Sequence, residues 1–298
     1  MKIVFCADDY GMTENSSRRI EECAVNGILN RASVLVDGEF DDFKSRLDDI
    51  GCDVSLHINL VEGRPLTKNG TFRLLTDKDN MFRFSFIGLL FASLSSKKKL
   101  LAEEIYTEIR SQLSFYKKCM GTDEIVIDSH QHVIMIPLVL RSLLRALKDE
   151  GVTARYIRVP KEPLMPYVTS PSLYFTYSPV NMIKQLLLNF LCRINKRTFE
   201  KENIKPSLFM GVLFSGKMDE KRVGKILPKY IKLAEKKGQD IELAFHPGYF
   251  EEGEALNEDT RKGFVKFYRS PSRRVEFDAL MKLKTNFYKK EGKINALH

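Results

Sequence analysis

The chain has 298 residues, of which 43% are hydrophobic and 29% are charged. This composition is typical of a folded globular protein and excludes a disordered or fibrous one. Its 48 Lys and Arg outnumber its 39 Asp and Glu, so the formal net charge is +9. The basic residues are dispersed in short groups such as Lys97–Lys99, and no nucleic-acid-binding motif accompanies them. We therefore expect a basic, solvated surface and no nucleic-acid partner.

Cysteine usage and apolar runs indicate the compartment. The cysteines are odd in number and never spaced as CxxC, which argues against a disulfide framework and against a structural zinc site. The apolar run before the aspartates at the amino terminus is too short for a signal peptide. The longest uncharged apolar stretch, Phe84–Leu94, is too short to cross a bilayer. These features predict a soluble, cytoplasmic protein.

Short apolar runs alternate with helical patterns from the amino terminus onward. Lys2–Ala7 predicts a buried strand, and Thr13 is placed to cap a helix that ends near Gly27. Further strands are predicted at Ala32–Val36, Asp53–Leu60, Glu124–Ile127, Tyr156–Val159, Leu208–Leu213 and Asp240–Phe245. Further helices are predicted at Lys98–Met120, Pro137–Glu150, Asp219–Lys237 and Ser272–Lys284.

This alternation predicts an α/β fold with a parallel sheet. We expect a distorted or incomplete (β/α) barrel in a single domain over residues 1–298, with an open doubly wound sheet as the alternative. Two long excursions, residues 61–96 and 160–207, contain prolines and glycines and interrupt the alternation of strands and helices. Long excursions of this kind often cover a site, and we interpret them as loops or lids.

Residues able to bind metals or transfer protons gather where predicted strands end. They are Asp8, Asp9, His57, Asp128, His130, His132 and His246. Ligands of parallel α/β folds bind at the carboxyl ends of the strands. In an extended chain, His130 and His132 share a face, so both could reach one ion.

Each signal also has a purely structural explanation. Asp8 and Asp9 could cap the helix that starts near Thr13, His57 could be a buried core histidine, and His246 could belong to a turn that ends a strand. Their common location favours metal-assisted hydrolysis instead. Imidazoles and one carboxylate can bind a divalent ion, a second carboxylate can act as general base, and a further histidine as general acid.

Six segments resemble the signature blocks of the YdjC-like carbohydrate deacetylases, a family that includes chitooligosaccharide and hopanoid-associated deacetylases. They are ADDYGMT (7–13), SLHINL (55–60), IDSHQHV (127–133), IRVPKEP (157–163), FMGVLFSG (209–216) and AFHPGY (244–249). The resemblance implies a distorted (β/α) barrel related to polysaccharide deacetylases. It also implies metal-dependent hydrolysis of the N-acetyl group of an amino sugar.

Position by position, the resemblance implies that Asp9, His57 and His130 hold the metal. Asp8 matches the general base and His246 the proton donor. The reaction would release acetate and a free amine, with a backbone N–H of the Asp9–Gly11 turn helping to stabilise the oxyanion.

The resemblance also implies supporting roles. Asp128 would fix a ligand imidazole, Arg158 would orient Asp8 or contact the substrate, and His132 would line the sugar pocket. The family often reads SHxHxH, whereas Ile134 stands at the third position here, so we expect altered substrate contacts. Magnesium or zinc is the expected ion, and manganese, cobalt or nickel would also suit such ligands.

The sequence also leaves other functions open. The chain could be a metal-dependent hydrolase of another bond, in a lipid-linked sugar, a cyclic amide or a phosphoester, or a catalytically silent sugar-binding barrel. The expected partner is a small N-acetylated sugar. Two segments, Phe84–Leu94 and Ile183–Ile194, combine apolar residues with nearby basic ones. They predict either a homodimer or lid element or a peripheral contact with a membrane.

Overall fold

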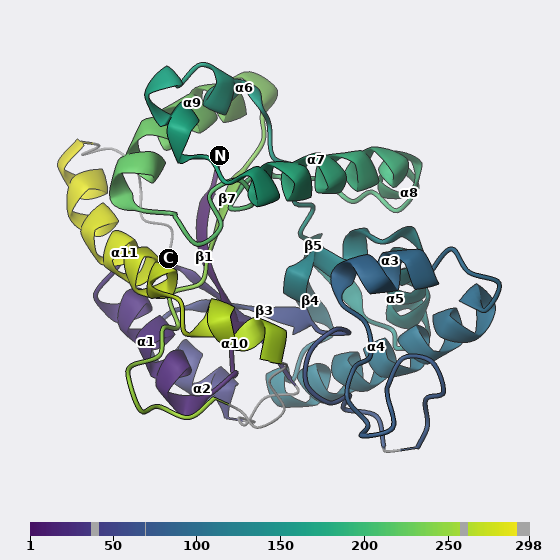
Figure 1. Ribbon diagram of the computed structural model, residues 1–298. Coiled ribbons are helices and arrows are strands. Elements are labelled where there is room, and N and C mark those ends of the chain that lie inside the picture. Colours follow the sequence, from purple (N-terminus) through teal and green to yellow (C-terminus); the bar gives the residue numbers. More distant parts are fainter. Residues whose placement is uncertain (37–41, 69, 257–261, 291–298) are drawn as a thin grey trace.

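A single parallel sheet organises the molecule. The computed structural model describes residues 1–36, 42–68, 70–256 and 262–290 (Figure 1). The strands are β1 (Ile3–Tyr10), β2 (Arg31–Val34), β3 (Asp53–Ile58), β4 (Glu124–Ser129), β5 (Thr153–Ile157), β6 (Leu208–Met210) and β7 (Ile241–Phe245). All their pairings are parallel, and the order across the sheet is β5-β4-β3-β2-β1-β7-β6.

Helices fill the connections between strands. They are α1 (Glu14–Val25), α2 (Phe43–Asp48), α3 (Phe86–Ala92), α4 (Lys98–Met120), α5 (Pro137–Asp149), α6 (Met165–Val168), α7 (Pro179–Ile194), α8 (Lys196–Lys201), α9 (Glu220–Lys237), α10 (Lys262–Tyr268) and α11 (Pro271–Lys290). Two 3-10 helices, η1 (His130–Met135) and η2 (Pro171–Thr176), complete the set.

The strand order identifies an incomplete barrel. Strands follow one another around the sheet in chain order, with β7 beside β1 and a break between β5 and β6. The sheet also curls, because side chains from strands far apart in it meet inside. Tyr156 of β5 donates a hydrogen bond to Glu242 of β7 over 2.6 Å. The predicted incomplete (β/α) barrel is confirmed, and the open doubly wound alternative is wrong.

The predicted elements match the structure closely. All seven strands occur near their expected places, and Thr13 caps α1 by accepting a hydrogen bond from the backbone N–H of Ser16. Burial on both faces explains the apolar strands, since β7 is buried throughout and β1 from Phe5 onward. The short helices α2 and α10 were not predicted, because elements of six or seven residues show little periodicity.

The two excursions leave the carboxyl edge of the sheet and contain helices rather than only loops. Residues 61–96 follow β3 and include α3, whereas residues 160–207 follow β5 and include α6, η2, α7 and α8. Within the described residues, no helix combines the length and the apolar character needed to cross a membrane.

Candidate active site

The end of β1 brings two neighbouring carboxylates to the inside of the barrel. Successive side chains of a regular strand point to opposite faces. Here the register with β2 shifts between Ala7 and Tyr10, and Asp9 has a positive φ of 70°. This bulge lets both Asp8 and Asp9 contact residues of the interior, and both are almost fully buried. The hypothesis that they cap α1 is wrong, because Thr13 does so.

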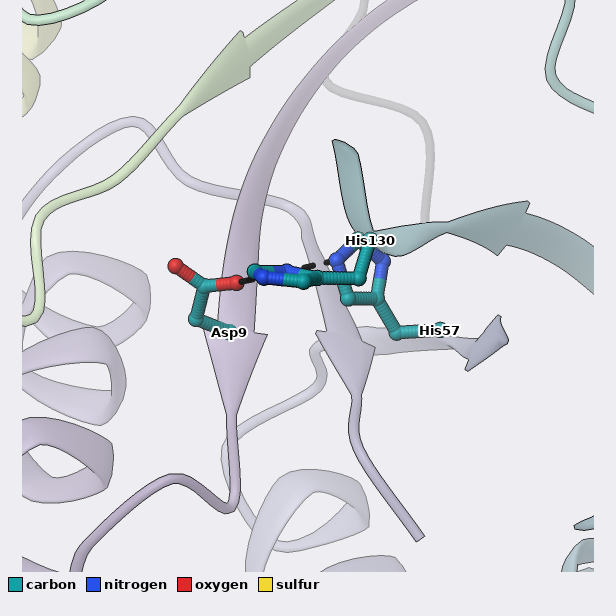
Figure 2. A group of neighbouring side chains, drawn as sticks. All are labelled: Asp9, His57 and His130. Carbon is teal, nitrogen blue, oxygen red and sulfur yellow. Dashed lines mark hydrogen bonds and ion pairs between the residues drawn. The ribbon is translucent and has the colours of Figure 1, made fainter. Parts of the chain in front are cut away.

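Asp9, His57 and His130 form a compact cluster (Figure 2). The Nδ1 atom of His130 lies 3.0 Å from Oδ1 of Asp9, and Nε2 of His57 lies 3.6 Å from the same oxygen. One ligand atom from each residue lies within 4.8 Å of those of the other two. Two imidazole nitrogens and a carboxylate oxygen at this spacing could hold one divalent ion.

His57 is oriented by the groups behind it. Its Nδ1 lies 2.5 Å from Oδ1 of Asp128. Ser33 donates a hydrogen bond to the same oxygen, and Ser55 donates one to Oδ2 of Asp128 over 2.8 Å. Alternation along β3 places Ser55 and His57 on one face. An Nδ1–H bound to Asp128 leaves Nε2, which faces Asp9, free to bind a metal. A carboxylate behind a ligand imidazole is a recurring arrangement in metal sites.

His130 has a similar support, which the sequence analysis missed. Its Nε2 lies 3.2 Å from Oε2 of Glu62, and the hydroxyl of Tyr268 donates to that oxygen over 2.7 Å. Glu62 follows β3, whereas Tyr268 ends α10. With Nε2 held by Glu62, the Nδ1 atom is presented to Asp9.

The charges of the cluster favour a bound cation. Burial opposes the charged form of His130, but Asp9 and Glu62 outweigh it and raise its pKa to about 10. Burial likewise opposes protonation of His57, yet Asp128 and Asp9 raise its pKa to about 9. Without an ion, His57 and His130 are therefore both protonated at neutral pH and carry two positive charges between them. A divalent ion can supply the same positive charge to neutral imidazoles.

Arg158 connects the carboxylates of the site. Its Nη1 donates to both oxygens of Asp8, over 2.9 and 2.8 Å, and its Nε donates to Glu242 over 2.9 Å. Its Nη2 lies 3.1 Å from Oδ2 of Asp128. Two other acidic groupings, Asp8 with His57 and Asp128, and Cys6 with Asp128 and Glu242, also have close ligand atoms. Of these three groupings, the Asp9 cluster is the one with two imidazoles beside a carboxylate, so it is the better metal site.

The carboxyl-terminal helices close the site from the other side. Arg273 of α11 is almost fully buried, and its Nη2 lies 2.5 Å from Oδ2 of Asp9. Glu276 of α11 accepts a hydrogen bond from the backbone N–H of His246 over 2.6 Å, and the same oxygen lies 3.5 Å from Nδ1 of His246. Burial raises the pKa of Asp9, but His130 and Arg273 bring it well below its usual range, so Asp9 stays ionised.

The structure separates His132 from the metal cluster. Gln131 and His132 both have positive φ, of 52° and 62°, so the chain turns after His130 instead of continuing extended. The ring of His132 packs edge-on against Phe209 at 5.6 Å. The expectation that His130 and His132 share one face is therefore wrong. Burial, together with Lys184 and Arg158, lowers the pKa of His132 and keeps it neutral.

The turn after Asp9 excludes one of the backbone N–H groups that could stabilise an oxyanion. Gly11 has a φ of 91°, which favours glycine, and a Cβ there would lie 2.9 Å from the carbonyl oxygen of Leu35. Its N–H donates to Ser17 over 2.9 Å. The Gly11 N–H is thus already used and is no donor for an oxyanion.

Residues distant in sequence complete the site. Glu62, Glu242, Tyr268, Arg273 and Glu276 were not singled out, because single acidic, aromatic or basic residues in a charged chain carry no local signal. Glu242 could have been noticed, since it is a charged residue within the otherwise apolar strand Ile241–Phe245.

The fold and the site define a class: an incomplete (β/α) barrel with a histidine–aspartate cluster able to hold a metal at the carboxyl ends of its strands. The family described as YdjC-like protein matches residues 2–288, so the chain belongs to the YdjC-like family. A protein named carbohydrate deacetylase from Danio rerio is 27% identical over 228 residues, which are 73% of this chain and 66% of that protein.

A solved structure agrees in fold. It is that of a protein from Enterococcus faecalis V583 assigned to cellobiose-phosphate cleavage. The TM-score is 0.68 with 16% sequence identity, over 98% of this chain and 95% of the other. At this identity the likeness shows the shared fold.

Proposed function

We propose that this protein is a metal-dependent carbohydrate deacetylase, a hydrolase that removes the N-acetyl group of an acetamido sugar. The observation that carries the proposal is the cluster of Asp9, His57 and His130 with Asp8 directly beside it in the chain. Family membership and the relative named carbohydrate deacetylase support the same reaction. The products are acetate and a free amino sugar.

The residues divide the chemistry among them. A divalent ion held by Asp9, His57 and His130 would lower the pKa of a water molecule and polarise the acetamide carbonyl. Asp8 accepts a proton from the attacking water as general base, and Arg158 fixes the position of its carboxylate. His246, whose Nδ1 faces Glu276, donates a proton to the departing amine.

Substrate contacts are assigned to the remaining polar side chains. His132 is neutral and buried beside Phe209, so it is suited to hydrogen-bond a sugar hydroxyl rather than to carry charge. Arg158 is buried and pairs with three carboxylates, which favours a role in positioning Asp8 over direct contact with the sugar. Ile134 is buried in the core, where it offers no polar contact.

The proposal extends to the identity of the metal ion and to the cellular compartment of the enzyme. We propose magnesium or zinc as the ion, since both tolerate mixed nitrogen and oxygen ligands with open positions for substrate and water. Cys6, Cys23, Cys52 and Cys192 are buried thiols that form no disulfide. Reduced thiols fit the cytoplasm as the working compartment.

The test is acetate release from N-acetylglucosamine, its short β-1,4 oligomers and other acetamido sugars, measured with chelated enzyme and after adding Mg²⁺ or Zn²⁺. Metal-dependent acetate release from one of these is the expected result. A His246→Gln variant should bind metal as the wild type does but release acetate slowly. If no sugar releases acetate although metal is bound, the enzyme cleaves another bond or serves as a sugar-binding protein.

A further inference from the structure

Exposed large apolar side chains concentrate in two segments of this molecule. Within the described residues, the exposed ones lie in the two excursions, apart from Met1, Val25, Leu100 and Val275. The residues on α3 and after it are Ile87, Phe91 and Leu94. Those on α6, η2 and α7 are Leu164, Met165, Val168, Tyr174, Phe175, Val180, Met182, Ile183, Leu186, Phe190 and Ile194. We call this set the apolar rim. Apolar surface of this extent on a folded protein marks an interaction site.

Helix α7 is amphipathic with its apolar side turned outward. Gln185, Leu188 and Cys192 are buried against the barrel. Ile183, Leu186 and Phe190 recur at helical spacing on the opposite side and are 68%, 55% and 58% exposed. In Figure 1, α7 and α8 extend from the barrel as an arm. Nothing else in the described part of the chain covers the outer side of this helix.

Basic residues predominate within the two segments that carry the apolar rim, although Lys196 also lies 3.5 Å from the exposed Glu200 just after the second segment. The segment from 163 to 199 contains no Asp or Glu, but it contains Lys184, Arg193, Lys196 and Arg197. The segment from 80 to 102 also lacks acidic residues and contains Arg83 and Lys97–Lys99. Exposed apolar side chains with an excess of basic residues beside them match the surface of an anionic bilayer.

The same helix also reaches the active site. Lys184 lies on α7 near enough to Asp8, Asp9 and Glu162 for their charges to act on its ammonium group, while burial lowers its pKa. Asn181 donates hydrogen bonds to the carbonyl groups of Leu213 and Ser215, which follow β6. Both excursions leave the carboxyl edge of the sheet, where the site lies. The segments that carry the apolar rim thus start from the edge of the sheet at which the site lies.

We propose that the apolar rim is a docking surface for an anionic membrane, with Phe91, Ile183 and Phe190 inserted among the acyl chains and Lys97–Lys99, Lys196 and Arg197 paired with lipid phosphates. Docking would hold the carboxyl edge of the barrel, and thus the active site, at the bilayer surface.

The test is co-sedimentation of the full chain with vesicles of phosphatidylglycerol and phosphatidylcholine in equal parts, and with vesicles of phosphatidylcholine alone. We expect binding to the anionic vesicles at low salt that weakens as salt is added. Ile183→Ser with Phe190→Ser should weaken binding by about tenfold or more. Lys196→Glu with Arg197→Glu should weaken binding to the anionic vesicles in the same sense.

Matched controls distinguish binding through the apolar rim from nonspecific binding to vesicles. Val25→Ser with Val275→Ser removes exposed apolar residues elsewhere, and Lys236→Glu with Lys237→Glu removes basic charge on α9. Both pairs should bind vesicles like the wild type, and thermal melts should show that every variant folds. Wild-type protein that stays in the supernatant overturns the proposal, as do control variants that lose binding equally.

A second copy of the chain is the rival occupant. If the wild type sediments as a dimer in analytical ultracentrifugation, and Ile183→Ser with Phe190→Ser makes it a monomer without any vesicle binding by either protein, the apolar rim is a dimer interface and the proposal is wrong. Vesicle binding is measured without a sugar substrate, so its outcome does not depend on the deacetylase activity.

Discussion

Arg158 binds Asp8 through a single nitrogen, Nη1, which donates to both carboxylate oxygens over 2.9 and 2.8 Å. The same guanidinium reaches Asp128, the carboxylate that orients His57. One buried cation thus joins the proposed general base to the support of a metal ligand. Asp8 and the support of His57 are thereby held in a fixed relative position, which is what efficient acid–base catalysis requires.

Asp8→Asn should abolish turnover and leave the metal bound. The amide keeps the size of the side chain but cannot accept a proton from water, so we expect kcat to fall by about a hundredfold to ten-thousandfold. Acetate release and metal content by atomic emission are the measurements. Loss of metal in Asp8→Asn, with metal retained in Asp9→Asn, would show that the two aspartates have exchanged roles.

Arg158→Lys should lower kcat more than it changes KM. Lysine keeps the charge, but its single ammonium cannot bind Asp8, Asp128 and Glu242 in the fork geometry of a guanidinium. We expect a fall in kcat of roughly tenfold to a hundredfold. The matched control is Arg155→Lys on β5, the strand that Arg158 directly follows; the Arg155 side chain is 59% exposed and pairs with Asp53. Equal effects of both substitutions would mean that Arg158 acts only on general stability.

Glu62→Gln should weaken metal binding by about tenfold, because it removes the carboxylate that holds Nε2 of His130. Tyr268→Phe, which removes the hydrogen bond from its hydroxyl group to Glu62, should act in the same direction with a smaller effect. Competition for the metal with a chromophoric chelator measures both affinities. Glu254→Gln, which breaks an ion pair with Arg19, should leave the affinity unchanged. Unchanged affinity in Glu62→Gln would contradict this role.

Metal binding should stabilise the protein increasingly as the pH rises. The pKa of His57 is raised to about 9 and that of His130 to about 10, above the value of about 6.5 expected in the unfolded chain. Protonation therefore stabilises the ion-free fold fully below about pH 6.5, and this contribution is lost as the pH rises through 9 to 10. A bound metal requires neutral imidazoles, so protons compete with it.

The measurement is the difference in Tm between metal-loaded and chelated protein over a pH series. This difference should grow from about pH 6.5 toward pH 9, and metal should no longer raise the Tm of His57→Ala. A difference that stays constant or shrinks with rising pH would show that the two imidazoles are not ligands.

The sequence by itself determined the seven strands, their parallel arrangement and the edge at which chemistry would occur. These features are local, because apolar runs, helix caps and residues at strand ends are read within short windows. The segments around Asp8–Asp9, His57, His130 and His246 also carried the family resemblance, which implied the reaction before any distance was known.

The tertiary structure alone decided how those residues act on one another. Backbone geometry produces the bulge at Asp9 and the left-handed turn at Gln131 and His132. The contacts from α10 and α11 join segments more than two hundred residues apart in the chain, as the ion pair of Arg273 with Asp9 shows. The sequence singled out Ile183–Ile194 as an apolar segment with basic neighbours, but not which side of α7 faces outward. Apolar spacing predicts an amphipathic helix, but whether its apolar side faces the core or the surroundings is decided by packing.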